Sequence, residues 1–305
     1  MKFLGWNIAT ETTLSYLFKN INAAWTDNDL GFVNWTWPNY YRSFWAMNPD
    51  NVEYANPNFA EAGALKVGRI DANGDMIYGD SVNVNYTYVQ ENASPYNTGG
   101  TAAVPTKATK IIVASQLVDK DGNVVELAEF KGFRSDIAGT LGNMANLSTI
   151  YYQAEGKRVK ITPEMIQFAD DDTYAVLTEA AESNTFYLSG TATETATVEQ
   201  VNVALKNLGT AKVWKDGKSY YYTDIRHLGK ITEADGVQTP SVGAYGVVRN
   251  HSYQVVVTSV TGLGTPVYNP DEVIDPETPE EEESYLAARI KVLSWRVVKS
   301  TVDLK

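Results

Sequence analysis

The segment that most constrains the fold of this 305-residue chain is its C-terminal stretch, 285–304, which reads YLAARIKVLSWRVVKSTVDL. Apolar residues alternate along it, as is typical of a β-strand. A strand of this length would run about 65 Å at about 3.3 Å per residue, whereas most strands have about 3–10 residues. We therefore expect a strand that either folds back on its own body or enters another molecule.

One face of this strand is apolar along most of its length, which makes it suitable for insertion. Backbone hydrogen bonds would supply affinity, and alternate side chains would set the register. Each buried Ile, Val, Leu or Trp contributes about 1.5–3 kcal/mol before entropy costs. A head-to-tail contact of this kind builds an open filament when its rotation does not close. The predicted anchors are Leu286, Ala288, Ile290, Val292, Trp295, Val298, Val302 and Leu304.

An acidic, proline-spaced segment precedes the strand. Residues 269–284 (NPDEVIDPETPEEEES) hold eight of the 37 acidic residues, and the rest of the chain balances 29 acidic against 25 basic residues. Repelling carboxylates and Pro270, Pro276 and Pro279 favour an extended linker. We thus predict a globular domain over 1–268, a linker over 269–284 and a donor strand over 285–305. A net charge of −12 argues against a nucleic-acid partner.

The body before the linker has the composition and turn pattern of a β protein. Tyrosine occurs 19 times, and Asn73-Gly74, Asp121-Gly122 and Asp216-Gly217 each predict a tight hairpin between two strands. The stretch 240–268 reads as the last strand of the body, with Tyr253, Val255 and Val257 on one face and Gly262 and Gly264 at its end.

Three short helices are expected among these strands. Thr197 and Gln200 have capping-box spacing before an apolar 3.6-residue repeat that stops near Gly209. Thr162-Pro163-Glu164 opens a second helix, with proline at its first position, and 135–147 is a third candidate. Many strands and few helices predict an all-β chain built as a β-sandwich.

Several classes of site are disfavoured by composition. The chain has no cysteine and two histidines, His227 and His251, so thiolate chemistry is excluded and a histidine metal site has few ligands. We interpret both histidines as structural. No nucleophile, P-loop or dinucleotide motif is present, so we predict no enzyme, no cofactor and no metal. No apolar run approaches a membrane span and no signal peptide is visible; we expect further sequence upstream of Met1.

Other clusters have ordinary and functional interpretations side by side. Asp71–Asp75 and Asp119–Asn123 are similar to calcium loops but lack the sixth-position glycine and the closing glutamate, so hairpin turns explain them better. Residues 170–172 read as a solvated acidic turn. Aromatic residues gathered over 25–45 could fill a core, contact another subunit or stack on a sugar. The tryptophans concerned are Trp25, Trp35, Trp37 and Trp45.

Six segments resemble the short-fimbria fimbrillins of Bacteroidetes type V pili, in their C-terminal part. They are GWNIATETTLSYLFKNI (5–21), WTWPNYYRSFWAMNP (35–49), YTYVQENAS (86–94), VWKDGKSYYYTDIRH (213–227), GAYGVVRNHSYQVVVTSVTGLGTPV (243–267) and RIKVLSWRVVKSTVDL (289–304). The resemblance implies a transthyretin-like β-sandwich and a lipoprotein export route to the outer membrane. It also implies a protease-cleaved N-terminal domain whose groove receives a neighbour's C-terminal strand. The chain shows no lipoprotein signal or maturation site.

The sequence thus predicts a structural subunit of a cell-surface fimbria that polymerises by inserting 285–304 into a groove of the next copy. Its partners would be copies of itself, with tip and anchor subunits as further candidates, and no nucleic acid. The alternative hypothesis is a monomeric glycan-binding surface module that uses the tryptophans of 25–45. That alternative predicts that the closing strand packs on its own body.

Overall fold

A computed structural model describes most of the chain, in two compact units. Unit 2 holds residues 3–114, 220–265 and 271–305, whereas unit 1 holds residues 1–2, 115–219 and 266–270. The main part of unit 1 is thus inserted between two segments of unit 2, a division within the single body predicted over 1–268. The described residues are 1–14, 17, 53–66, 69–70, 76–77, 86–93, 108–170, 172–225, 227, 231–234, 237–240, 245–276 and 285–294.

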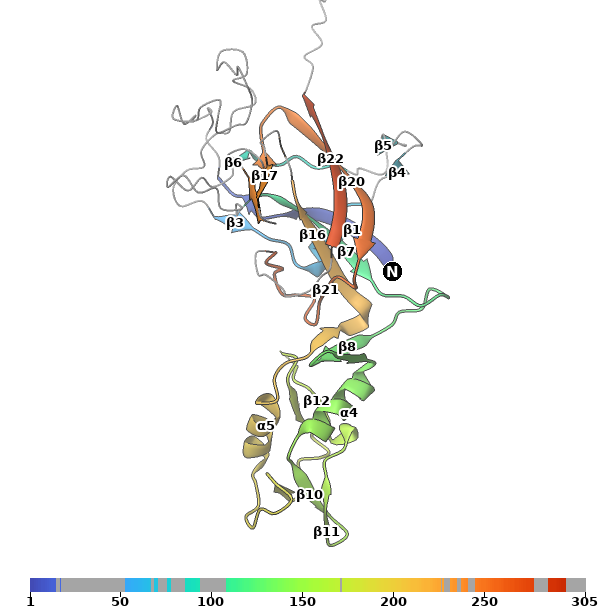
Figure 1. Cartoon of the computed structure of the whole chain (residues 1–305), viewed down its shortest axis with the longest axis vertical. Helices are drawn as coiled ribbons and strands as arrows, with labels where there is room; N and C mark the ends of the chain where they lie inside the picture. Colours follow the sequence, from blue (N-terminus) through green and yellow to red (C-terminus); the bar gives the residue numbers. More distant parts are fainter. Residues whose placement is uncertain are drawn as a thin grey trace, which may run out of the picture. The chain divides into compact units, whose positions relative to one another are not determined.

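Unit 2 is built around a sheet with the strand order β1-β7-β16-β21 (Figure 1). Its strands are β1 (Lys2–Ala9), β7 (Lys110–Gln116), β16 (Lys218–Asp224) and β21 (Thr265–Pro266). A long antiparallel pair joins β20 (His251–Thr261) to β22 (Tyr285–Ser294). Shorter pairs join β2 (Glu11–Thr12) to β3 (Tyr54–Ala55), β4 (Arg69–Ile70) to β5 (Met76–Ile77), β6 (Asn92–Ala93) to β19 (Gly246–Val247) and β17 (Ile231–Ala234) to β18 (Val237–Pro240). Helix α3 (Phe59–Ala62) has a capping box from Asn58.

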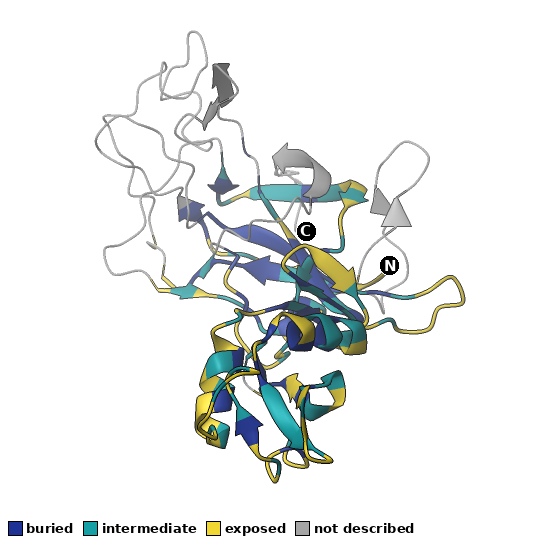
Figure 2. Cartoon of the chain, turned by 60° about the horizontal axis from the view of Figure 1, so that its bottom comes forward, coloured by how far each residue is buried: buried dark blue, intermediate teal, exposed yellow. Residues whose placement is uncertain are grey.

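The hydrophobic core of unit 2 lies between the central sheet and β20. The buried residues of this core come from the central sheet, the end of β16 and β19, and they are Ile8, Ile111, Val113, Tyr221, Ile225 and Val247. From β20, the partly buried Tyr253, Val255 and Val260 pack against them. Figure 2 shows the buried residues concentrated on the strands of this sheet. Two layers of strand that share one core make a sandwich, and the predicted mainly β chain with a few short helices is confirmed.

The face of β20 that meets the core differs from the predicted one in its second half. Tyr253 and Val255 face the core as alternation predicts, but Val257 is 38 % exposed and Val260 takes the next core position. The ladder with β22 shifts its register between Val257 and Ser259. Val257 keeps the phase of Tyr253 and Val255, as predicted, but it is absent from the core cluster. The extra residue at the β-bulge shifts the alternation after it, so that Val260 rather than Ser259 takes the next core position.

Unit 1 combines small sheets with two helices. Its sheets have the orders β15-β8-β9, β11-β10-β14 and β12-β13. The strands are β8 (Leu127–Phe130), β9 (Phe133–Ser135), β10 (Tyr151–Ala154), β11 (Lys157–Lys160), β12 (Ile166–Phe168), β13 (Ala175–Leu177), β14 (Phe186–Tyr187) and β15 (Lys212–Trp214). The helices are α4 (Ile137–Leu147), α5 (Val198–Lys206) and the 3₁₀ turns η2 (Pro163–Met165) and η3 (Lys215–Gly217).

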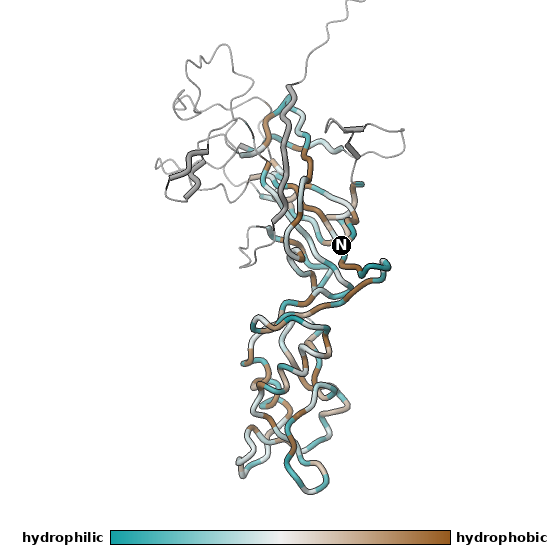
Figure 3. The backbone as a smooth tube through the Cα atoms, turned by 45° about the vertical axis from the view of Figure 1, so that its right-hand side comes forward, coloured by the Kyte–Doolittle hydropathy of each residue, from teal (hydrophilic) through white to brown (hydrophobic). Residues whose placement is uncertain are grey.

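The three predicted helices are present, the second as the short 3₁₀ turn η2, and the N-termini of α4 and α5 carry side-chain caps from Asp136 and Thr197. In α5 the Thr197 hydroxyl accepts from the Gln200 N–H at 3.2 Å, and the Gln200 side chain accepts from the Thr197 N–H at 2.9 Å. Val201 and Leu205 bury the apolar face of α5 in the unit 1 core, beside Met144 of α4. Figure 3 shows hydrophobic and hydrophilic residues alternating along the chain of this unit. In the described part of the chain, every helix is too short or too polar to cross a membrane.

The three predicted hairpins have three different outcomes. β4 and β5 pair across the Asn73-Gly74 turn, which confirms the first, although 71–75 lie outside the described residues. At Asp121-Gly122 the chain does turn, but the flanking segments share only the bridge between Val118 and Val124. The third is wrong, because β15 pairs with β8 and β16 with the central sheet. Asp216 and Gly217 do have positive φ angles, but the turn joins strands of different sheets.

Gly217 supports a testable prediction. A Cβ at Gly217 would lie 2.8 Å from the carbonyl oxygens of Leu117 and Val125, whereas a Cβ at Gly122 would meet nothing within 4 Å. Both glycines have a positive φ angle, +65° at Gly217 and +88° at Gly122. Both Gly217→Ala and Gly122→Ala incur backbone strain of about 1 kcal/mol. We expect Gly217→Ala to lose at least about 1–2 kcal/mol more, because it also forces backbone atoms apart. Urea unfolding midpoints measure the difference; equal midpoints would contradict it.

Candidate assembly site

The antiparallel ladder of β20 and β22 brings the predicted donor strand onto its own unit. Pairing runs from His251 opposite Ser294 to Thr261 opposite Tyr285, and Figure 1 shows the two arrows side by side. Four predicted anchors occupy defined register positions: Leu286 opposite Val260, Ala288 opposite Val257, Ile290 opposite Val255 and Val292 opposite Tyr253. Outside the described residues lie Trp295, Val298, Val302 and Leu304, and also Trp25, Trp35, Trp37 and Trp45.

The first half of the acidic segment contacts the body of unit 2. Ile274 is 7 % exposed, and its N–H donates to the Pro57 carbonyl at 2.9 Å. Val273 forms a bridge with Asn58, at the start of helix α3. The linker predicted from residue 269 is therefore docked as far as Ile274, and residues 275–284 separate Ile274 from β22.

An ion pair fixes the turn that begins β20. The Arg249 Nε donates to the Glu91 Oε2 at 2.5 Å, and the Arg249 backbone N–H also reaches Glu91 at 3.4 Å. The Glu91 side chain is 2 % exposed and that of Arg249 28 %. Asn250 follows with φ +63°, so the chain reverses sharply between β19 and β20. A charge as buried as that of Glu91 requires a partner, and Arg249 supplies it.

An aromatic cluster continues from this turn into β20. The Tyr253 hydroxyl accepts from the Val248 N–H at 2.9 Å and lies 2.7 Å from the His227 Nδ1. The His251 Nδ1 lies 3.0 Å from the Arg249 carbonyl oxygen, and the two histidine rings meet edge to face at 5.1 Å. Burial raises the pKa of Tyr253, although the Val248 N–H partly offsets this. These contacts agree with the structural role predicted for both histidines.

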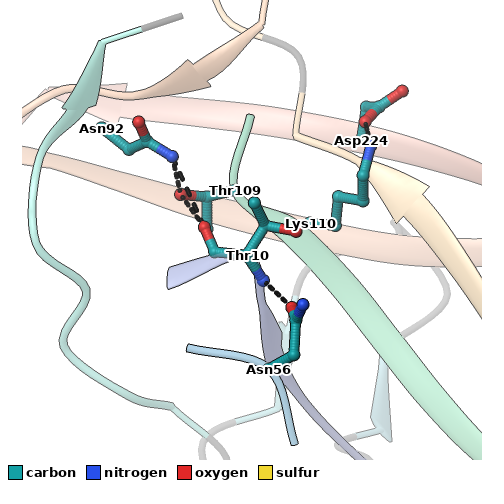
Figure 4. Close-up of polar contacts among 6 residues, drawn as sticks. All are labelled: Thr10, Asn56, Asn92, Thr109, Lys110 and Asp224. Carbon is teal, nitrogen blue, oxygen red and sulfur yellow. Dashed lines mark hydrogen bonds and ion pairs between the residues drawn. The ribbon is translucent and has the colours of Figure 1, made fainter. Parts of the chain in front are cut away.

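A buried polar network ties the same region to the central sheet (Figure 4). The Asn92 side-chain amide donates to the Thr109 hydroxyl at 2.9 Å, and Thr109 lies directly before β7. The Thr109 hydroxyl reaches the Thr10 carbonyl at 3.4 Å, and the Thr10 N–H donates to the Asn56 side chain at 2.6 Å. Asn92 itself pairs with Val247 of β19. Four segments distant in sequence are thus joined through one buried asparagine.

A second ion pair crosses the central sheet beside this network. The Lys110 Nζ, on β7, lies 2.5 Å from the Asp224 Oδ1, on β16, as Figure 4 shows. The Lys110 side chain is 6 % exposed, so the pair is shielded from solvent on the lysine side. Since β7 and β16 neighbour each other in the sheet, the pair joins the two strands along which the chain leaves unit 2 and returns to it.

The candidate cation loops have ordinary explanations where the structure describes them. The Asp119 carboxylate accepts from the Asn123 side-chain amide at 3.0 Å and from the backbone N–H groups of Asn123 and Asp121 at 2.9 and 2.8 Å, and these bonds within the loop lower its pKa. Asp172 lies in the turn between β12 and β13, as predicted. Among the described residues, no three His, Asp or Glu side chains gather as metal ligands.

Sequence patterns did not identify Glu91 and Arg249 as a pair. Both residues lie in segments that resemble fimbrillins, Glu91 in YTYVQENAS and Arg249 in GVVRNHSY, but 158 positions separate them. Periodicity reports which residues share a face of one element, and it carries no information on which distant element supplies a counter-charge. The nearest signal in the sequence was an arginine directly before Asn250, a residue type that favours turns.

Comparison with known families bears on this same region. Residues 212–301 match the family model described as major fimbrial subunit protein type IV, fimbrillin, C-terminal. This part of the chain resembles the C-terminal region of fimbrillins. The match runs from β15 through β20 and β22, and it confirms the resemblance predicted from the sequence over that range. The search of curated proteins found no match.

The fimbrillin match supports a structural, non-enzymatic subunit of a cell-surface fimbria, assembled with other subunits in a filament. The matched range contains Arg249, the β19–β20 turn and the β20–β22 ladder. Glu91 and Asn92, which hold that turn, lie outside it. The candidate assembly site is accordingly the β20–β22 ladder together with the contacts that position β20.

Replacing Glu91 tests the role of the ion pair. Glu91→Gln leaves the Arg249 guanidinium without its carboxylate, and breaking a buried pair costs about 3–5 kcal/mol, less where one partner is partly exposed. We expect a loss of about 2–3 kcal/mol and faster hydrogen exchange in 246–253. The control is Glu129→Gln, because the Glu129–Arg134 pair has an arginine that is 42 % exposed and should contribute under about 1 kcal/mol. Equal losses would contradict the assignment.

The raised pKa of Tyr253 predicts an alkaline limit to stability. The folded state keeps this phenol neutral, while the unfolded chain ionises it near pH 10. The unfolded state therefore binds fewer protons above pH 10, and stability falls as pH rises beyond it. Tyr253→Phe should flatten this fall and, by leaving the Val248 N–H unpaired, cost about 1–3 kcal/mol at neutral pH. Unfolding between pH 7 and 11 measures both effects; Tyr88→Phe, at an 81 % exposed side chain, is the control.

Proposed function

We propose that this chain is a fimbrial structural subunit that polymerises by donor-strand exchange, inserting 285–304 into a groove of the adjacent copy. The observation that carries the proposal is the placement of β22. It is the last described strand, it follows a linker, and among the described residues its one neighbouring strand is β20. A strand held along one edge and tethered at one end can leave without breaking other strand pairs.

The chemistry of the segment supports the same proposal. The predicted anchors Leu286, Ala288, Ile290 and Val292 recur at every second position, so a sheet that accepts the strand receives them on one face. Five carboxylates over 277–283 keep the connecting segment hydrated and extended before assembly. In the filament the strand would connect copies of this chain, with tip and anchor subunits as terminal partners, at the outer surface of an exporting cell.

Electron microscopy of the full chain beside a variant that lacks 285–305 tests the proposal. The full chain should form filaments, and the truncated variant should remain a folded monomer with an unchanged far-UV circular dichroism spectrum per residue. Ile290→Asp should act like the truncation, because it places a charge on the predicted anchor face. Lys291→Glu, one position along, should leave assembly intact. Filaments from the truncated variant would overturn the proposal.

The glycan-binding alternative gains support from one observation, the pairing of β22 with its own body. A single unassembled subunit would make the same pairing to cover its strand, so the pairing agrees with both hypotheses. The microscopy separates them, because the alternative requires monomers from the full chain. It also requires that Trp35→Ala or Trp37→Ala abolish sugar binding without unfolding the protein.

A further inference from the structure

The hydrogen bonds of Tyr253 determine where His227 carries its proton. The Tyr253 hydroxyl accepts from the Val248 N–H at 2.9 Å and lies 2.7 Å from the His227 Nδ1. A phenol has one proton to donate, and a buried hydroxyl keeps that proton in a hydrogen bond. Among the described residues, the His227 Nδ1 is the acceptor that this hydroxyl reaches. The bonding pattern therefore assigns His227 as a neutral ring with its proton on Nε2.

The surroundings of His227 disfavour a positive charge on its ring. The residue is 8 % exposed, and the titratable rings that contact it, among the described residues, are those of Tyr253 and His251 on β20. The His251 ring lies 5.1 Å away, so protonation of both histidines would place two like charges side by side. The Glu91 carboxylate acts on Tyr253, but it is bound by the positive charge of Arg249. Burial and charge thus both favour the neutral ring.

The bond between Tyr253 and His227 holds the start of β20. Through one hydroxyl, Tyr253 connects His227, three positions after the end of β16, to Val248, which lies before the turn at Asn250. Tyr253 also opposes Val292 in the ladder with β22. A change in the protonation of His227 therefore acts on both the turn and one end of the ladder.

We propose that His227 is a pH switch, and that protonation of its Nδ1 in acid loosens the turn and the start of β20. With a proton on Nδ1, two N–H groups face the Tyr253 oxygen, one from His227 and one from Val248. The phenol proton has then lost its acceptor inside the protein, which favours an open arrangement where water can bind it. The inference is independent of donor-strand exchange, because it concerns the stability of β20 within one chain.

The sign of the effect follows from proton binding. An imidazole in an opened or unfolded chain takes up a proton near pH 6.5, whereas the closed cluster excludes that proton. The open state then binds more protons, so stability falls as the pH drops below about 6.5. Complete exclusion would raise the equilibrium constant for opening about 30-fold between pH 7.5 and pH 5.0. Ordinary carboxyl groups take up protons mainly below this range, and the chain has two histidines.

Hydrogen exchange of the full chain at pH 7.5 and pH 5.0, corrected for the intrinsic exchange rates, tests the switch. Opening of 246–253 should increase about 30-fold, whereas that of β12 and β13 should stay constant. In His227→Gln an amide oxygen can accept from the phenol and cannot titrate, so the acid response should disappear. His251→Gln is the matched control and should keep most of the response. His251 donates from Nδ1 to the Arg249 carbonyl, and a proton on its Nε2 leaves that bond intact.

Nuclear magnetic resonance of the full chain with ¹³C- and ¹⁵N-labelled histidine keeps the test decisive if His227→Gln fails to fold. Two histidine signals are expected, and His251→Gln identifies which belongs to His227. At pH 7.5 the His227 ring should be neutral with its proton on Nε2. A proton on Nδ1 at this pH would overturn the proposal. So would an acid response of 246–253 that is equal in the unmodified chain and in His227→Gln.

Discussion

The ion pair between Glu91 and Arg249 is the contact on which the arrangement of unit 2 depends. It holds the sharp turn at Asn250, and that turn determines where β20 begins and which side chains it presents to the core. Next to Glu91, Asn92 connects the same turn to β7 and to the end of β1 through Thr109 and Thr10. Buried polar groups of this kind lose much free energy when a partner is removed, so they specify one geometry more strongly than apolar contacts alone.

This geometry gives β20 two roles that pull in different directions. Its inner face belongs to the core and must stay in place, while its edge pairs with β22, the strand proposed to leave. The clamp at Arg249 and the packing of Tyr253 and Val255 hold β20 independently of any partner strand. A strand held in place in this way loses little conformational freedom when another strand pairs with it, so its pairing is stronger than that of a mobile strand.

The sequence predicted those features that depend on residues close to one another along the chain. The capping box of Thr197 and Gln200 identified α5, and alternation identified β20 and the closing strand. Aspartate–glycine at 216–217 correctly predicted positive φ angles but not a hairpin, since a turn leaves open which strands its arms join. Lys131-Gly132 joins the real hairpin of β8 and β9 without the usual asparagine or aspartate. The insertion of unit 1 between β7 and β16, the bulge in β20 and the Glu91–Arg249 pair all depend on residues distant in sequence, and no local pattern encodes them.

The pairing of β22 with its own body has a thermodynamic consequence for assembly. The proposed exchange must first open the ten register pairs that join β22 to β20 of its own copy. An acceptor groove must therefore replace these backbone hydrogen bonds and bury the apolar anchor side chains at least as well. The ladder on β20 thus sets a barrier to the proposed exchange, because β22 has to leave its own body along its whole described length before it can enter another sheet.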